Sequence, residues 1–452
     1  MSFFFFLRPS SSSSSSSPQS LCLICTVFIF LVLFLINVEG FEPLIQLPHS
    51  PAARPRLETK ILYVNQFGAK GDGVQDDTDA FRNAWKIACA SITKASIVIP
   101  HDKKFLVRPI SFGGPCRAKV TVTISGTIIA PKDPDVWHGL NPQKWLYFHG
   151  VNHLTVRGSG IINGRGHKWW SQSCKINATN PCEHAPTAII FHRCKKLRVR
   201  DIALINSQRT HIAFTNSFRI VVSGIKMIAP ASSPNTDGLH ISSSSRVNIK
   251  DSIIRTGDDC ISIVGNSSII RIKNIACGPG HGISVGSLGM GNSWAQVHDV
   301  IVDQAFLAHT KNGLRIKTWQ GGRGFASQIT FQNVLMENVS HPIIIDQYYC
   351  DSLTPCLNQT LAVKVANISY VSIKGTSATE ESVRFACSDS FPCEKLYLEE
   401  VQLLSYTGKN TSSFCWEAQG LTSGSVDPPA CFSSNGTFIG QKADSGSALQ
   451  SF

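Results

Sequence analysis

The sequence has little charge, only four methionines, and none of the long patterns that mark several protein classes. Of its 452 residues, 16% are charged and 42% hydrophobic, which excludes an intrinsically disordered chain. The 34 glycines and 22 prolines are scattered and heptads are absent, which excludes collagen and coiled coils. After residue 40 no stretch approaches 18 consecutive apolar residues, so no later membrane span is expected. The length allows one large domain with a sizeable core.

The first forty residues have the features of a targeting segment. Arg8 and a serine run precede an apolar stretch from Leu21 to Ile36, which is short for a membrane span and typical of a signal peptide. We expect a signal peptide over residues 1–40, a linker over 41–56, one domain over 57–440 and a flexible tail over 441–452. Secretion follows, with no stable membrane association after cleavage; an uncleaved signal anchor is the alternative.

Cysteine usage fits an oxidising compartment, because thirteen of the fifteen cysteines lie beyond the signal segment. Close spacing suggests five disulfides, a sixth follows by elimination, and Cys194 is left as a buried free thiol. Sequence alone does not prove this connectivity. The thirteen contain no Cys-x-x-Cys spacing, which disfavours zinc. The candidate pairs are Cys174/Cys182, Cys260/Cys277, Cys350/Cys356, Cys387/Cys393, Cys415/Cys431 and, by elimination, Cys89/Cys116.

Seven Asn-x-Ser/Thr sequons are compatible with glycosylation of a secreted protein, although such sequons also occur by chance. They lie at Asn177, Asn266, Asn338, Asn358, Asn367, Asn410 and Asn435.

A short apolar alternation recurs from residue 150 onward and sets the expected architecture. Apolar residues occupy positions i, i+2, i+5 and i+7, with successive starts at residues 197, 220, 247, 270, 300 and 329. Alternation of period two indicates strands with one buried face. Two such strands per repeat bury their apolar faces only by stacking on neighbouring repeats, which predicts a solenoid. We therefore expect an all-β parallel β-helix; a large β-sandwich is the alternative.

One amphipathic helix is predicted, from Asp79 to Ile92, with Asp77 or Thr78 as its cap. Apolar residues recur along it at helical spacing. We expect this helix to cover the N-terminal end of the solenoid, where strand edges would otherwise be unpaired.

Four polar segments interrupt the apolar repeats at spacings close to one repeat. Asp237 precedes Asp258 by 21 residues, and Asp258 precedes His281 by 23. Equivalent positions in neighbouring coils stack about 4.7–4.9 Å apart, so these groups should form one column together with Asp259. The segments are Asn235-Thr236-Asp237, Gly257-Asp258-Asp259, Gly280-His281-Gly282 and Arg315-Ile316-Lys317.

Such a cluster suits the cleavage of a glycosidic bond. Carboxylates held close together raise at least one pKa, which keeps a proton available beside an ionised carboxylate. Inverting hydrolysis needs two carboxyl groups about 6.5–9.5 Å apart, which one coil step plus a lateral offset provides. Arg315 and Lys317 share one strand face and suit a substrate that carries carboxylates. Each segment alone is an ordinary turn or strand; only their common spacing favours a site.

The same segments resemble the signatures of the plant polygalacturonases, glycoside hydrolase family 28. The resemblance rests on SPNTDG at 233–238, TGDDCIS at 256–262, CGPGHGIS at 277–284 and RIKTWQGG at 315–322. Further matches are FGAKGDG at 67–73, DDT at 76–78 and DQYYC at 346–350, so the resemblance covers roughly residues 60–440.

The resemblance implies a right-handed parallel β-helix of about ten coils and inverting hydrolysis of galacturonan without metal or cofactor. Carried onto this chain, it makes Asp258 the general acid and Asp237 with Asp259 the pair that activates water. His281 would hold the hydrogen-bond network of the acid. Four residues would bind substrate: Asn235, Arg315, Lys317 and Tyr349.

Two departures from the family pattern, Gln208 and Arg323, lie near the expected cleft and bear on fine specificity. The partner implied is pectin in the cell wall, and a monomer is expected. The formal net charge of +12 suits such a polyanion. A nucleic-acid partner is not expected, because the sequence has no basic stripe and no aromatic stacking motif.

Several functional alternatives stay open at this point. A rhamnogalacturonan hydrolase or an exo-acting galacturonan hydrolase would share the family's segments. A calcium-dependent pectate lyase would share the fold, and a non-catalytic pectin-binding β-helix would share the carboxylates. Mode of attack depends on loops, and the segment from Gly166 to Thr187 is expected to form a wall at one end of the cleft.

Overall fold

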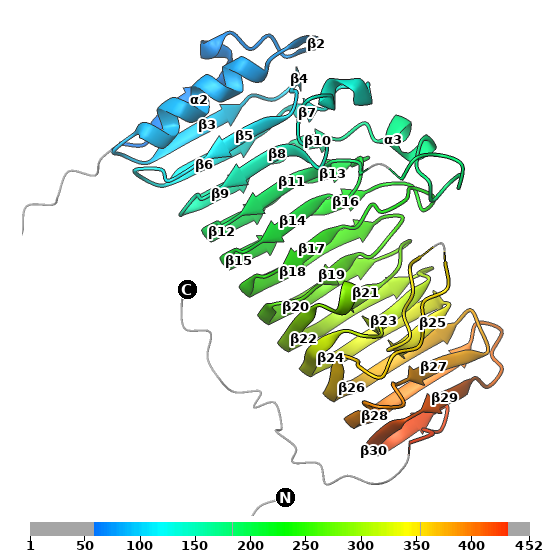
Figure 1. Cartoon of the computed structure of the whole chain (residues 1–452). Helices are drawn as coiled ribbons and strands as arrows, with labels where there is room; N and C mark the ends of the chain where they lie inside the picture. The colour runs from blue at the N-terminus through cyan, green and yellow to red at the C-terminus, as the bar shows by residue number, and fades with distance from the viewer. Residues whose placement is uncertain (1–57, 183, 353, 433–452) are drawn as a thin grey trace, which may run out of the picture. The chain divides into compact units, whose positions relative to one another are not determined.

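Parallel strands make up most of the chain in the computed structural model, which describes residues 58–182, 184–352 and 354–432. The strands form two long sheets, and the strand pairings within each sheet are parallel, which confirms the predicted parallel β-helix (Figure 1). The predicted signal peptide (1–40), linker (41–56) and tail (441–452) lie outside the described residues. In the described part of the chain, no helix is long and apolar enough to cross a membrane.

Sheet A has 19 strands and sheet B has 11. The strands of sheet B are β5 (Ile110–Gly113), β8 (Lys144–His149), β11 (Thr187–His192), β14 (Ile212–Thr215), β17 (Leu239–Ser242), β19 (Ile261–Ile263), β21 (Ile283–Leu288), β23 (Asn312–Thr318), β25 (His341–Asp346), β27 (Glu381–Ala386) and β29 (Ser412–Trp416). The first strands of sheet A are β1 (Lys60–Tyr63), β2 (Asp72–Asp76), β3 (Ala95–Ile99), β4 (Lys104–Leu106), β6 (Val120–Ile124), β7 (Thr127–Ile129), β9 (Leu154–Arg157), β10 (Ile161–Asn163), β12 (Lys195–Arg200) and β13 (Ala203–Ile205). Its remaining strands are β15 (Phe218–Ser223), β16 (Lys226–Ile228), β18 (Ser245–Arg255), β20 (Ser267–Cys277), β22 (Trp294–Ala308), β24 (Arg323–Val339), β26 (Lys364–Ser377), β28 (Cys393–Ser405) and β30 (Ala418–Asp427).

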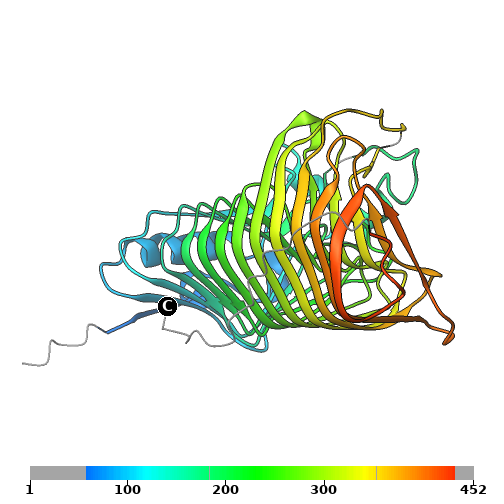
Figure 2. The same ribbon diagram turned by 90° about the horizontal axis from the view of Figure 1, so that it is seen from below.

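Each coil runs from a sheet B strand through two wall segments of sheet A and back through a loop. In one coil, β14 leads to β15 and β16, and a loop then leads to β17. The bends between walls use left-handed residues, such as Asn216 (φ 51°) before β15 and Gly224 (φ 64°) after it. The following coil has Ser243 and Asp251 at the matching bends. Figure 2 shows the coils stacked one behind another.

The predicted alternation is confirmed by burial along the stack. Leu197, Val199, Ile202 and Leu204 are all buried, and the matching residues of later coils are buried too. The inward face of sheet B also carries an aromatic stack, in which neighbouring ring centroids lie 4.5, 5.2 and 5.6 Å apart. Its members come from β5, β8, β11 and β14: Phe112, Phe148, Phe191 and Phe214.

The predicted N-terminal helix is α2 (Thr78–Ala90), so both of its expected ends require correction. Asp77 stands at the cap position, but its carboxylate accepts hydrogen bonds from the Lys70 and Gly71 amides instead of capping the helix. The buried face of α2 includes Trp85, whose indole donates to the Gly113 carbonyl at 3.0 Å. Its ring lies 5.2 Å from Phe112 and 5.6 Å from Phe148, so α2 covers the first coils (Figure 1). A second helix, α3 (His167–Ser171), and three 3-10 helices complete the elements: η1 (Val64–Phe67), η2 (Pro134–Trp137) and η3 (Met290–Asn292).

All six candidate disulfides are present with the expected pairing, and Cys194 is a buried free thiol. The bonds join Cys89 to Cys116, Cys174 to Cys182, Cys260 to Cys277, Cys350 to Cys356, Cys387 to Cys393, and Cys415 to Cys431. Burial raises the pKa of the Cys194 thiol to about 11, which keeps it in the unreactive neutral form.

Candidate active site

The polar segments gather where loops enter successive strands of sheet B. Asp237 precedes β17, Asp258 and Asp259 precede β19, and His281 precedes β21. The register aligns Leu239 with Ile261 and Ile261 with Ile283. Asp237, Asp259 and His281 each stand two residues before one of these, so they are the equivalent positions.

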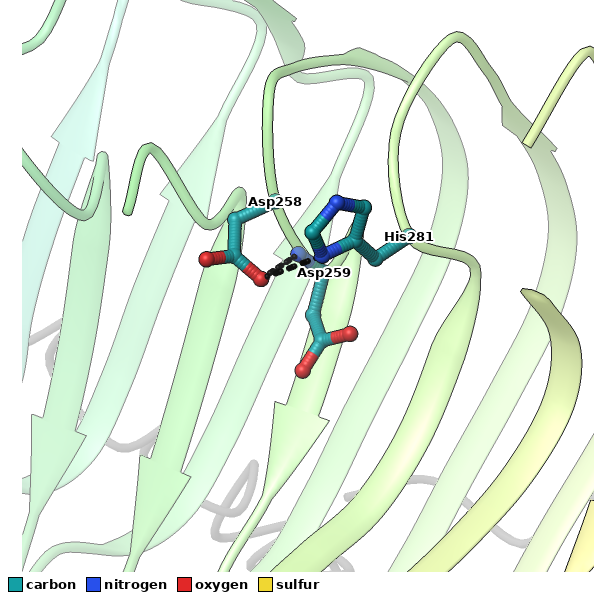
Figure 3. A group of neighbouring side chains, drawn as sticks. All are labelled: Asp258, Asp259 and His281. Carbon is teal, nitrogen blue, oxygen red and sulfur yellow. Dashed lines mark hydrogen bonds and ion pairs between the residues drawn. The ribbon is translucent and has the colours of Figure 1, made fainter. Parts of the chain in front are cut away.

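The expected column therefore needs one correction: Asp259, rather than Asp258, occupies the level shared with Asp237 and His281. Measured through Asp258, the spacings are 21 residues from Asp237 and 23 residues to His281. In the register, each coil is 22 residues long here, from Leu239 to Ile261 and from Ile261 to Ile283. Asp258 is displaced one residue toward the loop, which gives its side chain a different orientation from that of Asp259. Figure 3 shows Asp258 and His281 facing each other, with the carboxylate of Asp259 turned away from both.

Asp258 is held by hydrogen bonds from three sides. One oxygen lies 3.0 Å from His281 Nδ1 and accepts from the Asp259 amide at 2.8 Å (Figure 3). The other oxygen accepts from Asn235 Nδ2 at 3.3 Å. The side chains of Asp258 and His281 are 19% and 31% exposed, so the pair remains open to a ligand. These contacts bring Asn235 into the site as predicted.

Asp259 is buried between two cations. Arg315 donates to one of its oxygens at 2.7 Å and Lys317 to the other at 2.9 Å. Ser284 adds a third hydrogen bond at 2.8 Å and accepts one from Arg315 Nε at 3.0 Å. Arg315 and Lys317, expected only to bind substrate, thus also fix Asp259. Each keeps further N–H donors that no contact of the described residues uses.

The environments of Asp237 and Asp258 push their pKa values in opposite directions. Partial removal from water, and the negative charges of Asp258 and Asp259, raise the pKa of Asp237 well above its ordinary value. Burial raises the pKa of Asp258 as well, but the hydrogen bond and charge of His281 outweigh it and lower the pKa to about 2. When only one of these two carboxyls carries a proton, the opposed shifts favour Asp237 as its position in the free protein.

Sequence reasoning missed three residues that connect these groups: His240, Ser262 and Ser284. Ser262 donates to Asp237 at 2.9 Å, and its hydroxyl lies 2.8 Å from His240 Nδ1. Burial, with the charge of Arg209, lowers the pKa of His240 to about 4. His240, Ser262, Ser284 and Arg315 occupy one register column, on the outward positions between apolar residues. Aligning the repeats by their apolar residues would have found them.

Tyr349 also lies at the site, beyond the end of β25. Its ring meets Trp319 edge-on, with centroids 5.4 Å apart, and Lys317 Nζ lies 5.2 Å from its centroid. Burial and the negative charges of the cluster raise the pKa of its phenol, so it stays a neutral hydrogen-bonding group. The structure thus brings all eight predicted site residues together.

The two departures from the family pattern differ in position. Gln208 is buried one coil before Asp237, and neither atom of its amide has a partner among the described residues. In the same loop, His211 Nδ1 lies 2.9 Å from the Asp237 carbonyl oxygen and helps to place that residue. Arg323 is exposed at the start of β24, opposite Trp294.

The segment expected to wall the cleft consists of α3 and a loop closed by the Cys174–Cys182 disulfide. Trp169 and Trp170 anchor it: Trp169 packs against Trp137, and Trp170 donates to the Ser207 carbonyl at 3.1 Å. From this loop, Lys175 pairs with Asp351, two residues beyond Tyr349. That contact supports its interpretation as a wall.

A metal ion fits the cluster poorly. Asp258, Asp259 and His281 each offer a ligand atom, and these atoms lie within 4.8 Å of one another. Calcium takes six to eight oxygen ligands, whereas this group includes an imidazole. Both oxygens of Asp259 are already engaged by cations, and a third positive charge beside them would be repelled. The calcium-lyase alternative therefore does not fit these residues.

Comparison with known proteins points to one family. The profile described as glycosyl hydrolases family 28 matches residues 89–424. The chain is 55% identical to a probable polygalacturonase of Arabidopsis thaliana over 413 residues, covering 91% of this chain and 93% of that protein. It is 46% identical to a polygalacturonase of Persea americana over 382 residues, covering 84% and 82%. It is 48% identical to polygalacturonase-2 of Solanum lycopersicum over 356 residues, covering 79% and 78%.

Solved structures share the fold at much lower identity. An endo-xylogalacturonan hydrolase from Aspergillus tubingensis superposes with a TM-score of 0.70 at 21% identity, covering 81% of this chain and 100% of that one. A polygalacturonase from Erwinia carotovora gives 0.65 at 21% identity, covering 77% and 94%. These likenesses support the parallel β-helix alone.

Proposed function

The chain belongs to the glycosyl hydrolases family 28, and from that membership we propose that it hydrolyses α-1,4-galacturonosyl linkages of pectin with inversion. The observation that carries the mechanism is the cluster of three carboxyls on two neighbouring coils, in which His281 hydrogen-bonds to Asp258 while Arg315 and Lys317 hold Asp259. The environments of Asp237 and Asp258 also shift their pKa values in opposite directions. Paired acids whose environments separate their pKa values are typical of glycoside cleavage. The similarity to plant polygalacturonases supports galacturonan as the substrate.

Asp258 donates the proton to the leaving oxygen, and Asp237 with Asp259 activates the attacking water. In the free protein, His281 and the nearby cations keep Asp258 ionised. A substrate carboxylate at Arg315 and Lys317 partly neutralises these cations, which raises the proton affinity of Asp258. Burial and the charge of Asp259 still raise the pKa of Asp237, but once Asp258 carries the proton its negative charge no longer does so. Asp237 then ionises more readily and becomes the base.

Substrate binding uses the donors that Asp259 leaves free. Arg315 and Lys317 bind the galacturonate carboxylate, a geometry suited to charge-assisted hydrogen bonds. Tyr349 and Asn235 line the same cleft and orient the sugar. Because Lys317 contacts both Asp259 and the Tyr349 ring, it links the position of the substrate to that of the water-activating carboxylates.

Secretion to the cell wall is part of the proposal. Residues 1–40 act as a signal peptide, and the monomeric domain works outside the cell on pectin. Six disulfides support this setting, because such bonds persist in oxidising compartments.

The test is a product analysis on polygalacturonate. Proton NMR of the fresh product is expected to show the anomer opposite in configuration to the cleaved linkage, and chelator should leave the rate unchanged. Retained configuration, or a 4,5-unsaturated product that absorbs in the ultraviolet, contradicts the mechanism. A protein that binds polygalacturonate without shortening it, across acidic to neutral pH, would instead be the pectin-binding alternative.

A further inference from the structure

The outer face of sheet A carries a group of cations that the catalytic cluster does not use. They project from β9, β12, β15 and β18, and all are exposed. Within the described residues none of them takes part in an ion pair, whereas Arg200 and Lys250 on the same strands, and Arg271 and Lys273 on β20, do. We call this group the basic face: Arg157, Lys195, Lys196, Arg198, Arg219 and Arg246.

Coil stacking assembles the basic face from residues far apart in sequence. The register aligns Lys195 with Phe218 and Phe218 with Ser245. The next residues, Lys196, Arg219 and Arg246, therefore occupy one column over three successive coils, with φ values of 56°, 58° and 55°. Neighbouring coils are about 4.7–4.9 Å apart. The charges are spread along the sequence, because three of them lie on β12 and one each on β9, β15 and β18.

An aromatic ring organises part of this column. The guanidinium carbon of Arg219 lies 5.5 Å from the Phe218 ring centroid, and that of Arg246 lies 5.4 Å from it. Two arginines from adjacent coils thus share one ring, a cation–π arrangement. Phe218 thereby holds both guanidinium groups near the surface of the sheet.

The charges of the basic face act on a neighbouring titratable group. Burial lowers the pKa of His153, and the positive charges of Lys196, Lys119 and Arg198 lower it further. Like charges stacked in register oppose folding. Asp201 pairs with Arg200 at the end of β12 and Asp251 pairs with Lys250 within β18, but no carboxylate of the described residues pairs with the six cations of the basic face. A surface that retains such repulsion is complementary to an external polyanion.

The C-terminal coils of the same sheet differ in charge. The column of Lys196, Arg219 and Arg246 continues with Ile269, Asp299 and Gln328. Asp299 forms an ion pair with Arg271 at 2.6 Å, and Asp303 pairs with Lys273 at 3.2 Å. Three cations of this column are thus followed by three positions without a positive charge. Among the described residues of this sheet, exposed lysines outside ion pairs recur only later, at Lys374 on β26 and Lys395 on β28.

We propose that the basic face is a second, non-catalytic binding site for a polymer of uronate residues. It lies on sheet A, whereas the catalytic groups border the outward face of sheet B, so the two sites engage different strands of a pectin network. The choice of ligand rests on the proposed function, because a galacturonan hydrolase meets closely spaced carboxylates in its own substrate. Holding a second strand keeps the enzyme on its insoluble substrate between cleavage events.

The test compares two triple variants with the same change in net charge. One replaces three cations of the basic face: Arg198→Gln, Arg219→Gln and Arg246→Gln. The control replaces three exposed lysines on later coils: Lys374→Gln, Lys395→Gln and Lys409→Gln. Retention on a polygalacturonate column is measured over a salt gradient, in an Asp258→Asn background and with saturating trigalacturonate to fill the cleft. Kinetics on trigalacturonate are measured with Asp258 intact.

The basic-face variant is expected to elute at lower salt and to bind at least about tenfold more weakly at low ionic strength, because charge contacts with a polyanion are strongly salt-dependent. The control should stay within about twofold of the parent, and kcat/KM on trigalacturonate should not change in either variant. Equal losses in both triple variants would mean that retention follows net charge, which overturns the site.

If the parent protein is retained as strongly on polyglutamate or duplex DNA as on polygalacturonate, the basic face does not select a uronate polymer and the proposed ligand is wrong. If the intact enzyme fails to cleave trigalacturonate or polygalacturonate, the proposed function fails while the column comparison still reports on the basic face.

Discussion

Individual contacts decide which of the three carboxyl groups can move a proton. Asp259 is fixed on both oxygens by Arg315 and Lys317, so it has no free side from which to donate. Asp258 is partly exposed and joined to an imidazole, which gives it access both to substrate and to a proton source. Among the described residues the carboxyl of Asp237 hydrogen-bonds only to the Ser262 hydroxyl, and burial together with its negative neighbours favours its protonated form. The roles therefore follow from the partners and not from the residue type.

Replacing the proposed acid tests its role. Asp258→Asn retains size and most hydrogen bonds but has no acidic proton, so kcat on polygalacturonate should fall by at least about 10²–10⁴-fold. Binding of oligogalacturonide should change little, because a neutral amide does not repel a polyanion. Lys317→Ala is the contrasting variant: loss of a carboxylate contact should raise KM as well as lower kcat. Near-normal turnover of Asp258→Asn would contradict the assignment.

The raised pKa of Asp237 makes a prediction about stability and pH. A carboxyl whose pKa is higher in the folded state stabilises the fold fully below its unfolded pKa, and this contribution is lost as pH rises through the folded pKa. Asp237→Asn removes that dependence. The variant should therefore gain melting temperature relative to the parent as the pH is raised from about 4 toward neutral.

The exposed Asp201 provides a matched Asp→Asn control, because Asp201→Asn removes one surface carboxylate and leaves the catalytic cluster intact. Parallel melting curves for the parent and Asp237→Asn across the same range would show that Asp237 ionises without cost in the fold.

At the level of elements, the helix α2 and the stacked coils depend on each other. A β-helix ends in an apolar cross-section, and α2 covers it with a face that includes Phe81, Ala84 and Trp85. The Trp85 ring contacts the first two phenylalanines of the aromatic stack, so helix and stack form one core. The Cys89–Cys116 disulfide then ties the end of the helix to the first coils.

Removing the central side chain of this cap should destabilise the domain. Trp85→Ala deletes a buried ring and its hydrogen bond to Gly113, so we expect a loss of about 3–5 kcal/mol in the free energy of unfolding. Ile87 lies on the same helix but is 38% exposed, and Ile87→Ala should cost far less, on the order of 0.5 kcal/mol. Denaturant titration of both variants measures the difference, and equal losses would mean that α2 is not part of the core.

The sequence predicted the architecture well because burial repeats in every coil. Leu197, Ile220 and Val247 are all buried at matching positions. This regular burial is enough to predict the stacked coils even when the loop conformations are unknown. The helix boundaries were less accurate, since the start of α2 depends on contacts of Asp77 with the Lys70 and Gly71 amides that no local pattern encodes. The sequence likewise did not show whether Asp258 or Asp259, in the short loop before β19, occupies the position equivalent to Asp237 in the register.

The sequence predicted which residues belong to the site but not how their side chains contact one another. The repeat spacing predicted that Asp237, Asp258 and His281 lie close together. It did not predict that Arg315 and Lys317 form hydrogen-bonded ion pairs with Asp259. It also missed His240, which looks like an ordinary outward residue of a strand until the register places it beside Ser262. Proton placement depends on distances of a few ångströms between groups on different coils, and such distances come only from the folded chain.

At the scale of the whole molecule, charge should govern how the enzyme meets its polymer. A formal net charge of +12 attracts a polyanion over distances comparable to the Debye length, which is about 10 Å at 0.1 M salt and about 3 Å at 1 M. Raising the salt concentration should therefore raise the apparent KM for polygalacturonate several-fold while kcat changes much less, because screening weakens encounter and not the buried contacts of Asp259. Initial rates over a salt series measure this, with highly methyl-esterified pectin, where few charges remain, as a binding control that should show little salt dependence. A salt-independent KM for polygalacturonate would mean that contacts within the cleft alone determine recognition, and that the charge outside it has no part in capture.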